Sequence, residues 1–164
     1  MERVVLRAYS LPDDLDGLVR VYMDSVAHHA ALDPDPPRSP ITEAHARVRF
    51  ERMTADPDSL CLVAEAERAV AGLLEAHLRR EDITGFVGVY VNELAVARQQ
   101  RGRGIGRRLM AAAEEWARRH GASSIALDAM LANTGALRLY EEHLGFTRVA
   151  VILRRNLRHS DPGA

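Results

Sequence analysis

The sequence contains no lysine, since all 22 of its basic residues are arginine. Without a lysine side chain, the protein cannot form a lysine Schiff base with a substrate, and no lysine can act as its nucleophile. The absence excludes this chemistry but indicates no other, because the base composition of a genome can by itself remove lysine from a sequence.

Cysteine is almost absent as well, since Cys61 is the single one. One cysteine forms neither an intramolecular disulfide nor a cysteine-rich metal cluster. Cys61 lies in an apolar run at residues 60–63, which favours a buried thiol over a nucleophile. The seven histidines are scattered without the spacing of metal ligands, so we expect no metal site.

Long hydrophobic runs and an excess of basic residues are also missing. No stretch approaches the roughly 20 apolar residues that cross a bilayer, and the first residues do not resemble a signal peptide. The net charge is -1 and aromatic residues make up 5% of the chain, which is not typical of a nucleic-acid-binding protein. We therefore expect a cytoplasmic protein whose partners are neither membranes nor nucleic acids.

The length of 164 residues suits one compact domain, which we expect at residues 1–154, followed by a loose polar tail at 155–164. Apolar periodicity predicts an α/β order of strand, two helices, three strands, helix, strand, helix and strand, with a sheet of mixed strand direction. The predicted strands are residues 3–9, 60–65, 70–79, 86–97, 124–130 and 146–154. The predicted helices start at residues 10, 42, 104 and 133.

The strongest functional feature is the segment Arg-Gly-Arg-Gly-Ile-Gly at residues 101–106, between a predicted strand and a predicted helix. The first N–H groups of a helix have no partner within the helix and carry a partial positive charge. Glycine lets a ligand approach the backbone closely, and the two arginines add positive charge. This combination predicts a binding site for a phosphate or a pyrophosphate.

Two common nucleotide-binding motifs do not fit this segment. The P-loop requires a lysine followed by serine or threonine, whereas this sequence has Arg107 and Arg108. The dinucleotide fingerprint requires glycine at its first, third and sixth positions. Counting from Gly102, the third position is Gly104 but the sixth is Arg107. The phosphate therefore belongs to another kind of ligand.

The same segment, together with a second one downstream, resembles the GNAT superfamily of N-acetyltransferases. That family's acyl-CoA signature is Gln or Arg, two residues, Gly, one residue, and Gly or Ala, and its fixed positions are matched by Arg101, Gly104 and Gly106. Residues 133–146 resemble the family's second segment, Asn…Ala…Leu-Tyr…Leu-Gly-Phe. The two motifs stand at the expected separation, and the predicted order of elements agrees with the family to about residue 154.

The resemblance implies both a fold and a reaction. The family's fold is α/β, or α+β in some schemes, with a mixed, mostly antiparallel sheet of six to seven strands and helices on both faces. The implied reaction is transfer of an acetyl group from acetyl-CoA to a primary amine of a small molecule or peptide, by direct attack in a ternary complex. An acyl-CoA-binding regulatory or sensor module is the alternative. Members often dimerise, so a homodimer is an open expectation.

The resemblance also assigns residues to the donor. In the family, backbone amides of the Arg-Gly turn hold the pyrophosphate of CoA. The strand before the turn separates from its neighbour and receives the pantetheine arm, and one of its N–H groups would polarise the thioester carbonyl. The residues implied here are Leu94, Ala95, Val96, Arg101, Gly102, Arg103, Gly104, Ile105, Gly106 and Arg107.

Two residues of the second segment are implied in the site. Asn133 would contact the pantetheine arm and also cap its own helix. Tyr140 lies nearly two turns further along and shares a helix face with Asn133. By resemblance, Tyr140 is the general acid that protonates the departing thiolate. The alternative for Tyr140 is an aromatic side chain that only packs against the sheet.

The general base is less defined. Glu93 lies inside an apolar strand, where burial would raise its pKa toward that of a useful base. Asp128 is the second candidate, because some members of the family place a catalytic carboxylate there. Either acid has a structural alternative, a hydrogen bond to the backbone or to an arginine, and a chain of water molecules can replace both.

The amine acceptor is not identified by the sequence. His28 and His29 end the first predicted helix, in the region that lines the acceptor pocket in the family, and a solvated helix end is their alternative role. Acidic residues in the Pro-rich loop at 33–40 and at 81–82 hint at a cationic acceptor, although surface acids are usually only solvated. An antibiotic amine, a polyamine, an amino acid and a protein N-terminus all remain open.

Overall fold

The structure is a computed structural model that describes residues 4–33, 40–81 and 84–155. Its centre is a sheet with strand order β1-β2-β3-β4-β5. Neighbouring strands are antiparallel, except for the parallel pair of β4 and β5. The predicted mixed, mostly antiparallel sheet is therefore confirmed. Its strands are β1 (Val5–Ala8), β2 (Ser59–Ala66), β3 (Ala69–Glu81), β4 (Phe86–Val96) and β5 (Ser124–Leu127).

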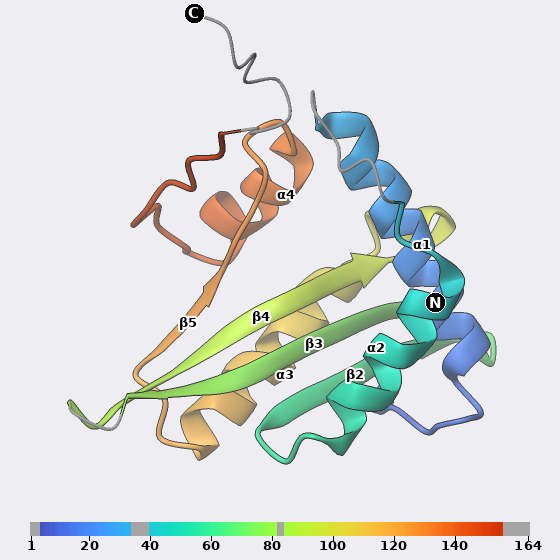
Figure 1. The fold of residues 1–164 in the computed structure, drawn as a ribbon, viewed down its shortest axis with the longest axis horizontal. Helices are drawn as coiled ribbons and strands as arrows, with labels where there is room; N and C mark the ends of the chain where they lie inside the picture. Colours follow the sequence, from blue (N-terminus) through green and yellow to red (C-terminus); the bar gives the residue numbers. More distant parts are fainter. Residues whose placement is uncertain (1–3, 34–39, 82–83, 156–164) are drawn as a thin grey trace, which may run out of the picture.

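Helices cover both faces of the sheet, as predicted. In Figure 1, α2 (Glu43–Ala55) lies in front of the sheet and α3 (Ile105–Arg119) lies behind it. The first helix, α1 (Leu15–Leu32), packs with α2 and with β3 in one buried cluster, which includes Phe50 and Leu73. The apolar side of α3 packs against the opposite face in a second cluster. None of the helices in the described ranges is long and apolar enough to cross a membrane.

The predicted strand at residues 146–154 is wrong, so the described sheet has five strands instead of the expected six to seven. These residues are rich in β-branched side chains, but a strand also requires a partner, and local propensity does not decide the outcome. The segment instead leaves Val149, Val151, Ile152 and Leu153 exposed. Of the predicted tail, residues 156–164 lie outside the described residues.

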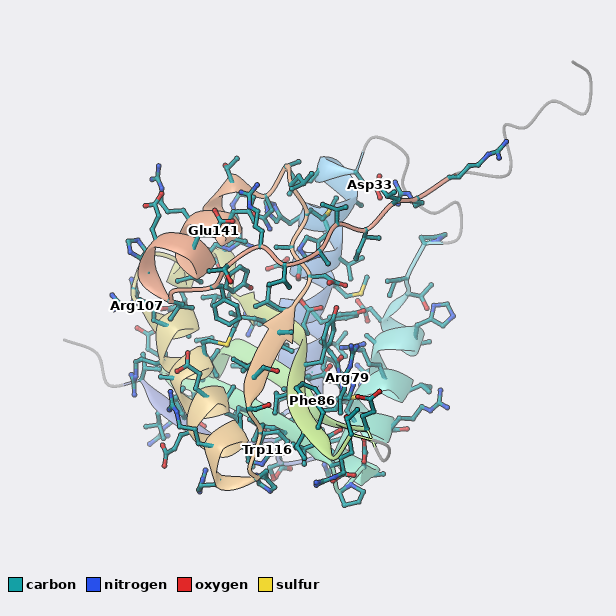
Figure 2. All side chains as sticks on the ribbon, turned by 90° about the vertical axis from the view of Figure 1, so that its left-hand side faces the viewer. Asp33, Arg79, Phe86, Arg107, Trp116 and Glu141 are labelled. Carbon is teal, nitrogen blue, oxygen red and sulfur yellow. The ribbon has the colours of Figure 1, made fainter. Side chains whose placement is uncertain are left out.

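The C-terminal segment is joined to the first helix by an ion pair. Arg154 donates two hydrogen bonds to the carboxylate of Asp33, at 2.8 and 2.6 Å. Asp33 directly follows α1, and Figure 2 shows the segment passing beside it. Two residues more than 120 positions apart in the sequence are therefore held together beside the C-terminal end of α1.

The helix starts follow their capping residues. Thr42 caps α2 by accepting from the N–H of His45, as its sequence predicts, and the His45 ring accepts in return from the Thr42 N–H. The start of α1 differs from the prediction, since the helix begins at Leu15 and not near Ser10. The carboxylate of Asp14 accepts from Arg7 at 2.6 and 2.7 Å and from the Ser10 N–H at 2.7 Å, which holds residues 10–14 in turns before the helix.

Candidate active site

Strand β4 contains a bulge that decides where Glu93 points. Along the ladder with β3, Ala76 is paired with Val91 and Glu75 with Glu93, so Asn92 is an extra residue. A bulge shifts the alternation of side chains by one position. Val91 accordingly packs on the α3 side, whereas Ala95 packs with α1 and α2. Glu93 shares the α1 side with Ala95, because strand residues two apart face the same way.

Beyond the bulge, β4 loses its neighbour on the other side. Its pairing with β5 extends only from Gly88 to Val91, so no strand in the described part of the chain pairs with that edge at residues 92–96. Leu94 and Val96 lie here, close to the start of α3. A Cβ placed on Gly106 would be 3.9 Å from Val96, 4.0 Å from Leu94 and 3.4 Å from Leu139. The separation predicted for β4 and β5 is therefore present.

The Arg-Gly turn connects this free edge to α3. Gly102 and Gly104 both have φ of +77°, and a Cβ added to either would meet no atom within 4 Å. Glycine is therefore needed for the backbone conformation, and the surface around it is open. Gly104 is the N-cap of α3 and supplies no side-chain hydrogen bond to the first helical N–H groups. The turn has the properties of an anion site at a helix N-terminus.

The arginines of the turn bind neighbouring groups of the protein or lie exposed beside it. Arg101 donates from Nε to the Val96 carbonyl at 3.1 Å, and Arg103 donates to the Gln100 side chain at 3.0 Å. Arg107 is exposed on the first turn of α3, close to the C-terminal helical turn that carries Glu141 (Figure 2). Ile105 is only 1% exposed and packs in the core cluster between α3 and the sheet, so its side chain is not available to a ligand.

The second predicted segment forms a helix in two parts. Asn133 caps α4 (Thr134–Arg138) by accepting from the Ala136 N–H at 3.2 Å, which confirms its capping role. A π-helical turn, Leu139–His143, follows directly and carries Tyr140. The Tyr140 ring packs against Phe146 with centroids 5.7 Å apart. Burial, together with the negative charge of Glu93, raises the pKa of Tyr140 to about 12, so the phenol is protonated at neutral pH.

Glu93 lies on the α1 side of β4, just beyond the bulge. Its Oε1 accepts a hydrogen bond from Ser25 of α1 at 2.8 Å. Burial raises the pKa of Glu93, and the bond from Ser25 and the positive charges of Arg49 and His29 oppose that rise. Glu93, a carboxylate with a raised pKa, and Tyr140, a phenol whose pKa is raised in part by the charge of Glu93, therefore lie near the point where β4 separates from β5.

The sequence matches the model of the Acetyltransferase (GNAT) family over residues 24–146. This chain belongs to the GNAT acetyltransferase family. No curated protein matches the sequence. Similar solved structures include a transcriptional regulator from Bacillus halodurans C-125, with 24% identity and a TM-score of 0.76, covering 94% of this chain and 99% of that one.

Two acetyltransferases are among the other similar structures. Glucosamine-6-phosphate N-acetyltransferase from Arabidopsis thaliana has 15% identity and a TM-score of 0.72, over 95% of this chain and 99% of that one. An aminoglycoside 6'-N-acetyltransferase from Acinetobacter haemolyticus has 21% identity and a TM-score of 0.72, over 93% and 97%. At these identities the likeness establishes the GNAT fold and not the acceptor.

Within this GNAT fold, the remaining predicted residues are placed less favourably. Asp128 is exposed just beyond β5. Burial and a hydrogen bond with Asp128 raise the pKa of Tyr90 to about 12, so that carboxylate already has a partner. His29 is exposed but near enough for its charge to act on Glu93, and the His28 ring lies 5.9 Å from the His29 ring. The geometry favours Glu93 over Asp128 as the base.

The sequence reasoning missed a second buried carboxylate in this GNAT site. Glu75 of β3 is the ladder partner of Glu93 and is 0% exposed. Its Oε2 accepts from Arg49 of α2, while its Oε1 and the Arg49 Nε have no hydrogen-bond partner among the described residues. Burial raises the pKa of Glu75 to about 7 although Arg49 opposes this. The sequence signal that could have identified Glu75 is its position as the single acid inside the apolar run 70–76.

Proposed function

We propose that the protein is an acetyl-CoA-dependent N-acetyltransferase that acts on a primary amine of a small molecule or peptide. The observation that carries the proposal is the placement of Glu93 and Tyr140 in one region, where β4 separates from β5 and leads into the Arg-Gly turn. A donor bound along β4 would present its reactive end between a base and an acid, which is the arrangement that acyl transfer to an amine requires.

The residues present fit the donor. The open backbone of the turn at residues 101–106 would hold the pyrophosphate, and the free edge of β4 at residues 94–96 would hold the pantetheine arm through backbone hydrogen bonds. Asn133 would add its side chain at the start of α4. When bound, the donor supplies an activated acetyl group as a thioester.

Two side chains of this chain would move the protons. Glu93 would accept one proton from the ammonium group of the acceptor, directly or through a water molecule, so that the neutral amine can attack the thioester carbon and form the new C–N bond. Tyr140 would give its proton to the sulfur as the C–S bond breaks, and the phenolate would recover a proton from the acetylated nitrogen, which loses its extra proton as the amide forms. A backbone N–H of β4 near Leu94 would stabilise the negative charge on the carbonyl oxygen. The products are an acetylated amine and free CoA.

The test is release of free thiol from acetyl-CoA against a panel of amines and peptides. We expect turnover with at least one amine, and we expect Tyr140→Phe to reduce kcat by about 10²- to 10⁴-fold, because it removes the proton donor. Calorimetric titration with CoA serves as the control, since the variant should bind it with nearly unchanged Kd. Tight binding of acetyl-CoA without thiol release from any amine would instead favour a sensor module.

A further inference from the structure

We propose that the acceptor is a primary amine that also carries an anionic group, a carboxylate or a phosphate, and that α2 binds this group. The inference rests on the proposed function and specifies its substrate class. It starts from a hollow of about 440 Å³ that is lined by residues of α1, of α2 and of the segment just before α2. The lining residues are Tyr22, Ile41, His45, Arg49, Arg52 and Met53.

The basic residues of the hollow lie on one side of α2. His45, Arg49 and Arg52 follow one another at i, i+4 and i+7, a spacing that places all three on the same helix face. Among the residues that the structure describes, no acidic one lines the hollow. The chain as a whole has a net charge of -1, so this concentration of positive charge is not a consequence of a generally basic protein.

The two arginines of the hollow differ in their partners. Arg52 is exposed, and it forms no ion pair with any carboxylate in residues 4–33, 40–81 or 84–155. By contrast, Arg47 of the same helix is paired with Asp16 at 2.6 Å. Arg49 is bound to Glu75 through one nitrogen only, and its Nε has no partner among the described residues. The unused Nε of Arg49 is buried, whereas the exposed guanidinium of Arg52 has donors that suit a carboxylate or a phosphate.

The hollow is connected to the reacting groups through Arg49. This side chain lies 5.3 Å from the centre of the Tyr22 ring and contacts Glu75. Glu75 is the ladder partner of Glu93, and partners on adjacent strands lie only about 5 Å apart. A small acceptor with its anionic end on α2 can therefore direct its amine toward Glu93. Ile41 and Met53 offer an apolar surface to the carbon chain between the two ends.

The acidic residues that hinted at a cationic acceptor do not oppose this inference. Glu81 accepts a hydrogen bond from Thr84 at 2.6 Å and pairs with Phe86, at the end of the β3–β4 hairpin away from Glu93. Asp33 is bound to Arg154, and the remaining acidic positions, in residues 34–39 and at 82, lie outside the described residues. The charged residues that line the hollow are Arg49 and Arg52, and Arg49 is paired with Glu75 behind it.

The test uses pairs of amines that differ only in the anionic group, with thiol release as the readout. γ-Aminobutyrate is compared with butylamine for a carboxylate, and O-phosphoethanolamine with ethanolamine for a phosphate. We expect kcat/KM to be at least tenfold higher for the anionic member of one pair, in keeping with a charge-assisted hydrogen bond. Whichever pair shows this difference identifies the anion. Equal or better turnover of both neutral amines would overturn the inference and leave the proposed function intact.

Two variants on α2 make the assignment local. Arg52→Gln should raise KM about tenfold for the preferred anionic amine and leave the KM of its neutral counterpart and of acetyl-CoA unchanged. Arg47→Gln removes the same charge from the same helix outside the hollow, and should change none of these constants. An equal effect of both variants, or an equal effect of Arg52→Gln on both amines, would refute the role of Arg52. Thiol release from no amine at all would instead refute the proposed function.

Discussion

The buried carboxyl group of Glu75 makes a quantitative prediction for stability. Its pKa is about 7 in the fold against an ordinary value of 4.5, and at about 1.4 kcal/mol per pKa unit this difference corresponds to about 3 kcal/mol. Because the folded protein binds this proton more tightly than the unfolded chain, the free energy of unfolding falls as the pH rises from about 4.5 to about 7. Above pH 7 the full destabilisation is present.

Glu75→Gln removes this titration while keeping the size of the side chain and an acceptor for Arg49. Wild type should therefore lose about 3 kcal/mol more stability than the variant between pH 4.5 and pH 8. Urea unfolding of both proteins, followed by circular dichroism across this range, gives the free energies. Titrating groups that do not interact with Glu75 act equally in both proteins and cancel in the difference.

The control for this experiment is Glu115→Gln, which removes an exposed carboxylate from α3. Its free energy of unfolding should follow the pH dependence of wild type. If wild type and Glu75→Gln change by the same amount between the two pH values, the carboxyl of Glu75 is not held with a raised pKa. A variant that loses more stability than wild type on going to high pH would reverse the sign and refute the reasoning directly.

Two further substitutions test the site itself. Glu93→Gln should lower kcat by about 10²- to 10⁴-fold. It should also remove the acidic limb of the pH–rate profile, since the raised pKa of Glu93 sets that limb. An equal loss of activity in Asp128→Asn would instead make Asp128 the base. Gly104→Ala should lower the free energy of unfolding by about 1–2 kcal/mol, because φ is +77° there although the added Cβ would meet no atom. The same variant should weaken CoA binding in titration calorimetry. The control Gly135→Ala, at a position without a left-handed φ, should keep the stability of wild type.

The Arg-Gly turn was predictable because its function depends on backbone conformation. Gly102 and Gly104 adopt a left-handed φ that other residues rarely tolerate, so the requirement is visible as glycine in the sequence. The capping residues Thr42 and Asn133 were predictable for a similar reason, since each accepts a hydrogen bond from an N–H three residues ahead. Local chemistry of this kind needs no knowledge of the rest of the fold.

The direction of Glu93 and the end of the sheet depend on neighbours. Simple alternation would place Glu93 on the α3 side with Val91, and only the extra residue in β4 turns it toward Ser25. No residue type at Asn92 announces a bulge. Residues 146–154 have the composition of a strand, but without a partner strand they remain irregular, because pairing and not propensity forms a sheet.

The acceptor side was hidden for a third reason, which is that side chains from separate helices build it. Tyr22 comes from α1, and His45, Arg49 and Arg52 come from α2. Each alone is an ordinary helix residue. The positive charge of the hollow becomes evident only when the fold shows which side chains line it together. In the proposed function backbone groups hold the donor, so we expect the donor site to tolerate changes of side chain that the acceptor hollow does not. Substitutions on α2 should therefore change which amine is used without changing the KM for acetyl-CoA.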